Sequence, residues 1–213
     1  ALSPMDGIGP DDVKINEFNL GTFLGNSMVG VVDGTFFLNG EARSFSDIDF
    51  NKIEGHVNRF DLADYSYSNI KVENTSFVDK MLYAEVKVDD RNLDLAYKGT
   101  IDLNGEPKMN MALTVDKAFL GKLKLMHGDS TDLSLNIVIN TVGLNPNTME
   151  GVAVAQNIHF TDGKKDIKIP NLTLKLDRNP TQDQIEITSS LLNVKAKGKI
   201  DFNSIGGILE DQL

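Results

Sequence analysis

Apolar and polar residues alternate along most of the chain, and the longest uninterrupted alternation covers residues 93–105, LDLAYKGTIDLNG. Its odd positions up to 103 carry Leu, Leu, Tyr, Gly, Ile and Leu, whereas its even positions carry Asp, Ala, Lys, Thr and Asp. A period of two predicts a β-strand with one apolar and one polar face. The pair Asn104 and Gly105 then predicts the tight turn of a β-hairpin.

The end of this strand recurs elsewhere in the chain as a six-residue unit. The unit reads GTFFLN from Gly34, GTIDLN from Gly99 and GKIDFN from Gly198. Shorter alternating segments between these units predict roughly twelve to fourteen two-faced strands in an antiparallel meander. Helix is expected only as a single turn within residues 116–125, capped by Asp116, because Gly121 interrupts that segment.

The alternation also predicts irregularities and boundaries. The apolar residues switch from odd to even positions at Asn58, which predicts a β-bulge. They switch again before Ile158, where the pattern is compatible with a bulge or a strand break. Pro170 is expected at a bend or a sheet edge. We expect a flexible lead-in over residues 1–12, one β segment over 13–203, and a tail over 204–213 that is compatible with the start of a helix.

Charge and composition narrow the function. The formal net charge is −10 and no stripe of Lys or Arg is present, which argues against nucleic acid or anionic headgroups as surface partners. The chain has no cysteine, so disulfides and thiolate chemistry are excluded and the redox compartment stays open. No apolar run reaches the length of a membrane helix and no signal peptide is recognisable at the start, so we expect an internal piece of a larger protein.

Candidate catalytic chemistry is sparse. His56, His127 and His159 share no short spacing, and the acidic pair Asp89 and Asp90 fits turn chemistry. No phosphate-binding glycine loop, calcium loop or nucleophile elbow is present. We therefore expect no enzymatic activity, no metal and no cofactor.

The apolar strand face is the more informative feature, because a long sheet must fold over, close or bind a ligand to remove that face from water. The face is rich in aliphatic residues and lacks Trp. Two alternatives remain open: a packed sandwich core, or a smooth surface that holds acyl chains. In the second case the expected lining residues are Phe36, Leu38, Leu82, Val86, Leu93, Leu95, Ile101, Leu103, Met109, Met111, Leu113, Leu135, Ile137, Leu172, Leu174, Val194 and Ile200.

Residues 65–125 carry a resemblance to a known family. The matching segments are 67–70 (YSNI), 88–95 (VDDRNLDL), 99–103 (GTIDL), 115–118 (VDKA) and 123–125 (LKL), followed more loosely by 133–135, 151–160, 162–177 and 187–202. In these residues the chain resembles the TamB family, the AsmA-like translocation and assembly module subunit of the bacterial envelope, in its Bacteroidetes-type form. The matching patterns are those of β-strands and contain no catalytic signature.

The resemblance implies an all-β fold in which an elongated antiparallel meander curls into a trough, the β-taco, with an apolar interior. It implies an internal fragment of a periplasmic envelope protein that is anchored in the inner membrane of a Gram-negative cell and reaches an Omp85-type outer-membrane partner resembling TamA. The implied function is the conduction of phospholipid acyl chains between the two membranes. Alternatives are a scaffold that binds outer-membrane protein strands by β-augmentation, and a spacer with a dry core.

Overall fold

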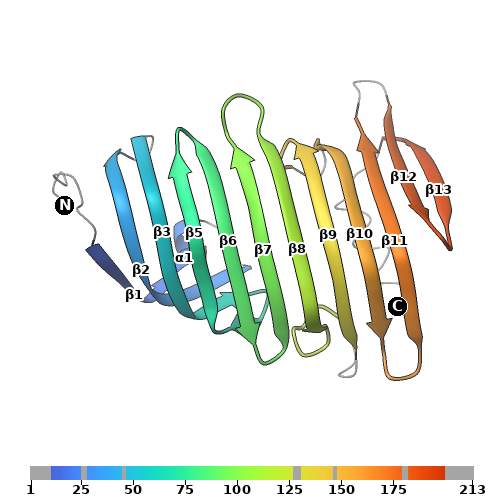
Figure 1. Ribbon diagram of the computed structural model, residues 1–213, viewed down its shortest axis with the longest axis horizontal. Coiled ribbons are helices and arrows are strands. Elements are labelled where there is room, and N and C mark those ends of the chain that lie inside the picture. Colours follow the sequence, from blue (N-terminus) through green and yellow to red (C-terminus); the bar gives the residue numbers. More distant parts are fainter. Residues whose placement is uncertain are drawn as a thin grey trace.

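The computed structural model describes residues 11–24, 28–44, 47–126, 131–145, 148–178 and 182–199. They form one antiparallel sheet of 13 strands and one short helix (Figure 1). The strands are β1 (Asp11–Asn19), β2 (Val29–Ser44), β3 (Asp47–Leu62), β4 (Tyr65–Tyr67), β5 (Ile70–Val78), β6 (Met81–Asp90), β7 (Leu93–Asp102), β8 (Lys108–Phe119), β9 (Asp132–Val142), β10 (Glu150–Thr161), β11 (Asp166–Asp177), β12 (Asp183–Ser189) and β13 (Asn193–Gly198), and the helix is α1 (Leu20–Leu24).

The strands follow one another through the sheet in chain order, except that the short β4 extends the β5 side of β3. Strands β1 and β13 form the two outer edges and do not pair with each other, so the sheet is open. The predicted meander and the predicted number of strands are confirmed. The β7–β8 hairpin has Asn104 and Gly105 in its connection, but this connection is a loop over residues 103–107 and not the predicted tight turn. The positive φ of 76° at Gly105 explains the glycine.

The register places residues of the same kind side by side across the whole sheet. One row runs from Val86 to Tyr97, Leu113, Ile137 and Ala155 on five successive strands. Within each strand, successive side chains point to opposite sides, and the register brings like sides of neighbouring strands together. The sheet therefore has two chemically different faces. We call the face that contains this row the apolar face.

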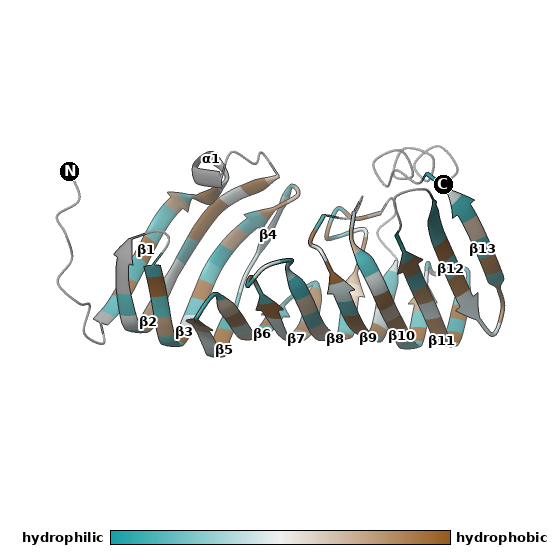
Figure 2. Ribbon diagram, turned by 90° about the horizontal axis from the view of Figure 1, so that it is seen from above, coloured by the Kyte–Doolittle hydropathy of each residue, from teal (hydrophilic) through white to brown (hydrophobic). Residues whose placement is uncertain are grey.

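The sheet curves toward the side on which α1 and β4 lie, as Figure 2 shows. Leu20 of α1 packs against Val32 and Val57 of the apolar face, so this face is the concave side of a trough. The convex side carries cross-strand ion pairs, such as Lys98 with Glu85 at 2.6 Å. The all-β trough with an apolar interior is thus the observed architecture.

Both predicted parity changes are bulges within continuous strands. In the β2–β3 pair the register steps from Asp33 opposite Arg59 to Gly34 opposite Val57, which leaves Asn58 as the extra residue. In β10 the change occurs at Asn157, whose φ is 52°.

Pro170 lies inside β11, in the first part of the strand, which has no partner in β12. The pairing with β12 begins at Leu172. The missing N–H of Pro170 therefore removes no ladder bond on the β12 side. The expected edge position is confirmed.

Three expectations need correction. Strand β1 begins at Asp11, inside the predicted lead-in. Asp116 belongs to β8 and caps no helix, because β8 continues to Phe119. Helix α1 was not predicted, since its five residues carry no helical period. The predicted tail over 204–213 lies outside the described residues.

Candidate functional site

The candidate site is the concave apolar face, which we call the groove. Most of the predicted lining residues lie on strands with the parity of this face. They are Phe36, Leu38, Leu82, Val86, Leu93, Leu95, Ile101, Met109, Met111, Leu113, Leu135, Ile137, Leu172, Leu174 and Val194. That they contact a ligand stays a prediction.

The remaining two predicted lining residues have different positions. Leu103 follows the end of β7, its amide donates to the Lys80 carbonyl at 3.0 Å, and its side chain is 39% exposed. It therefore belongs to the rim of the groove and not to its lining, because the strand ends one residue earlier. Ile200 lies outside the described residues.

The predicted set omitted residues that the register places on the same face. Tyr97, Val115, Ile139 and Ala153 pair with predicted lining residues or continue their rows. The alternation alone was sufficient to find them.

One end of the groove is closed by a wall. Tyr65 and Tyr67 of β4 pack edge to face with ring centroids 4.7 Å apart, and Tyr65 also contacts a turn that follows β8. In that turn Leu123 is 1% exposed and its amide donates to the Phe119 carbonyl at 3.0 Å. We call β4, α1 and this turn over residues 120–126 the end wall.

A buried carboxylate fastens the end wall to the sheet. Asp90, at the end of β6, is 3% exposed. One carboxylate oxygen accepts hydrogen bonds from the Tyr65 hydroxyl at 2.6 Å and from the backbone amide of Asn92 at 2.9 Å. The other oxygen accepts hydrogen bonds from the hydroxyl of Ser68 at 2.6 Å and from its backbone amide at 3.1 Å. Burial opposes ionisation, but these hydrogen bonds outweigh it and the pKa of Asp90 lies below its usual value.

The rest of the groove has no covering layer among the described residues. Two clusters of buried apolar residues lie around the end wall. Among the other described apolar residues, only Ala84, Ala155 and Leu176 are buried. The other lining side chains are half-buried by their neighbours in the sheet, except Val194 of the edge strand β13, which is exposed. Small residues interrupt two neighbouring rows of this open part: Gly99 and Ala153 lie in one row with Met111 and Ile139, and Gly151 lies in the next row.

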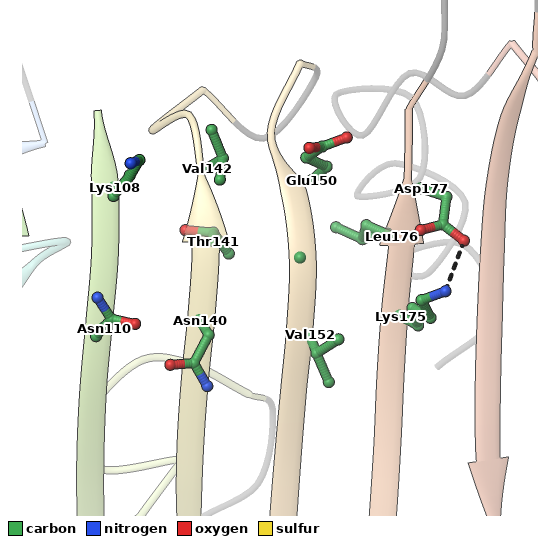
Figure 3. Close-up of a pocket in the computed structure, with 11 residues that line it drawn as sticks. Lys108, Asn110, Asn140, Thr141, Val142, Glu150, Val152, Lys175, Leu176 and Asp177 are labelled. Carbon is green, nitrogen blue, oxygen red and sulfur yellow. Dashed lines mark ion pairs between the residues drawn. The ribbon is translucent and has the colours of Figure 1, made fainter. Parts of the chain in front are cut away.

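A separate hollow of about 330 Å³ lies on the convex side of β8 to β11 (Figure 3). Its polar lining residues point away from the groove and include Lys108, Asn110, Asn140 and Glu150. At one side of the hollow, Lys175 and Asp177 of β11 form an ion pair at 3.0 Å (Figure 3). This hollow is shallow, and it contains both acidic and basic side chains. These side chains lie on the convex side and do not reach the groove.

The convex charges are satisfied by each other. Lys98, Tyr83 and Asn74 all donate hydrogen bonds to the exposed carboxylate of Glu85 and lower its pKa to about 2. In the described part of the chain no three His, Asp or Glu side chains lie close enough together to hold a metal ion. His159 pairs with Asp166 at 2.9 Å on exposed strands. No helix among these residues has the length and apolarity to cross a membrane.

Comparisons of the chain with protein families, with curated proteins and with solved structures found no match.

Proposed function

We propose that this chain is a section of a lipid-carrying groove and that the open part of its concave face binds phospholipid acyl chains. The observation that carries the proposal is the apolar face, which continues from strand to strand of the open sheet and which, among the described residues, is covered only at the end wall. The sheet is about 50 Å wide at ~4.8 Å per strand. The groove has the length to hold acyl chains along the direction in which the strands are stacked.

The energetics favour such a ligand over a small polar molecule. Each methylene removed from water contributes about 0.8 kcal/mol, and the contact needs no directional partner. An aliphatic surface with a polar rim allows the headgroup to stay in water while the chain is buried. The function is therefore binding and guidance of lipid, with no chemical step.

The resemblance to the TamB family supports a role for this activity in the cell envelope. In that setting the chain is an internal section of a periplasmic protein that is anchored in the inner membrane, and phospholipid moves along the groove toward the outer membrane. An Omp85-type partner resembling TamA engages the full-length protein. These assignments rest on the resemblance, and the apolar groove is compatible with them.

The test is native mass spectrometry with lipid extraction on the purified protein. We expect co-purifying phospholipid near one or more molecules per chain. Ile101→Asp, which places a charge on the groove floor, should abolish this occupancy, whereas Thr100→Asp, one residue away on the convex face, should keep it. Retained lipid in folded Ile101→Asp, or lipid-free wild type, contradicts the proposal.

A second candidate function is a scaffold that binds protein strands. The outer sides of β1 and β13 have no strand partner among the described residues, and such edges bind extended peptides by β-augmentation. Lys195 and Lys197 on β13 favour an acidic strand. Binding of outer-membrane strand peptides that is insensitive to Ile101→Asp would favour this function.

A further inference from the structure

Tyr97 places a hydroxyl group on the otherwise apolar floor of the groove. Its ring belongs to the row between Val86 and Leu113. The hydroxyl oxygen lies over Gly99, where an added Cβ atom would be only 2.8 Å from it. Glycine at 99 therefore leaves the space into which the Tyr97 side chain extends.

The Tyr97 hydroxyl differs from the other polar groups on this face in β5 to β10. Thr75 donates to the Glu73 carbonyl at 3.0 Å, and Thr141 donates to the Gly143 carbonyl at 3.4 Å. Asp90 is fully hydrogen-bonded at the end wall. The Tyr97 hydroxyl makes no hydrogen bond with any described residue.

The surroundings of this hydroxyl are apolar. Burial is the cause that raises the pKa of Tyr97, with no contribution from a neighbouring charge or hydrogen bond. No side-chain polar atom in the described residues is both fully enclosed and without a partner, so the hydroxyl remains accessible from the groove. An accessible donor in apolar surroundings gains from a ligand acceptor, because water competes poorly there.

We propose that Tyr97 is the specificity-determining residue of the groove and that its hydroxyl donates a hydrogen bond to the ester carbonyl of an acyl glycerolipid. This inference rests on the proposed function, since it names the lipid class that the groove selects. The acceptor is an ester and not a free carboxylate because the rows around Tyr97 carry no Lys or Arg to balance a buried charge.

The depth of the hydroxyl fits this ligand. From Gly99 the strand continues for three residues to its end at Asp102, which is about 10 Å at ~3.3 Å per residue. A carbonyl held at this depth keeps the glycerol inside the groove and lets the headgroup extend toward the rim, where the turns carry the exposed charges of Lys80 and Glu106. From the carbonyl, the acyl chain then follows the floor in the direction in which the strands are stacked.

The test compares two lipids that differ in the carbonyl alone: dodecanoyl-lysophosphatidylcholine and its dodecyl ether analogue. Their dissociation constants are measured by titration calorimetry below the micelle concentration. Wild type should bind the ester roughly three- to tenfold more tightly than the ether, the range of one neutral hydrogen bond. Tyr97→Phe should weaken ester binding to the level of the ether and leave ether binding unchanged.

Tyr83→Phe is the matched control. Tyr83 lies on the neighbouring strand but on the convex face, where its hydroxyl bonds to Glu85. This variant should keep the preference for the ester. Because the Tyr97 hydroxyl has no partner among the described residues, Tyr97→Phe should also keep the wild-type melting temperature, which separates a binding defect from unfolding.

The outcomes distinguish this inference from the proposed function. If wild type binds neither lipid, the lipid-carrying function fails and the inference fails with it. If both lipids bind and Tyr97→Phe changes neither affinity, the groove function stands and the role of Tyr97 is refuted. A Tyr97-dependent affinity for dodecanoate without one for the ester would overturn the choice of ester.

Discussion

Replacing Asp90 by Asn tests whether the end wall is held by its buried carboxylate. The change keeps the shape of the side chain but replaces one acceptor oxygen by an NH2 donor. Each oxygen of Asp90 accepts two hydrogen bonds, from Tyr65 and Asn92 on one side and from the hydroxyl and amide of Ser68 on the other. Whichever way the amide is oriented, its NH2 group therefore faces two donors.

The expected cost follows from these contacts. Hydrogen bonds to a charged acceptor contribute about 1.5–3 kcal/mol each, and the hydroxyls of Tyr65 and Ser68 are able to rotate and accept from the new NH2 group. We therefore expect Asp90→Asn to lower the free energy of unfolding by about 2 to 3 kcal/mol at neutral pH. That is a large part of the stability of a typical domain.

The pH dependence gives a second signature. The pKa of Asp90 in the folded protein lies below its ordinary value of 3.8. The stability from its ionised form is therefore fully present above that value and is lost as the pH falls through the folded pKa. The Asp90→Asn variant has no such titrating group. The difference in the free energy of unfolding between wild type and variant should therefore decrease below about pH 4.

Urea unfolding, followed by circular dichroism and tyrosine fluorescence, measures both effects. Asp89→Asn is the matched control: the same chemical change at the next residue, where an exposed carboxylate accepts from Asn69 at 3.1 Å. This control should change the free energy of unfolding by no more than about 0.5 kcal/mol. Equal stability of the two variants, or a difference from wild type that is constant down to pH 2, would refute the reasoning.

The remaining predictions concern packing and backbone. Leu123→Ala should destabilise the protein by about 2–5 kcal/mol in urea unfolding, because Leu123 is 1% exposed in the end wall; Leu125→Ala, at a position that is 54% exposed, should be near neutral, and equal effects would refute the packing assignment. Gly151→Ala should lower the melting temperature, because φ is 148° there and the new Cβ atom would lie 2.1 Å from the Asn140 carbonyl oxygen. Unchanged melting would refute that close approach.

The strands and their two faces were predictable from the sequence because they depend on residue parity, which is local. The change of parity at Asn58 located a bulge correctly, and the change before Ile158 located a second one. Pro170 was placed at an edge for the same local reason, the missing N–H.

The end wall was not predictable in this way, because it depends on contacts between distant segments. The sequence indicated a turn at Asp89 and Asp90, and the 2.9 Å bond from the Asn92 amide to Asp90 is such a turn contact. The bonds from Tyr65 and Ser68 to the same carboxylate require the tertiary fold. Parity placed Tyr97 on the apolar face, but only the structure shows that its hydroxyl lacks a partner in the described part of the chain.

Stability and the proposed binding activity are separated along the sheet. The tightly packed apolar clusters lie between β2 and β8 together with the end wall, so this part supplies its own core. Strands β9 to β13 carry equally apolar concave rows but contribute few fully buried residues. If this face served only to stabilise the fold, we would expect a second layer of the chain to pack on it. Half-buried aliphatic rows lose about 25 cal/mol of hydrophobic stabilisation for each Å² that stays in water. Among the described residues the chain supplies that layer at one end only, and an acyl chain would supply it along the rest.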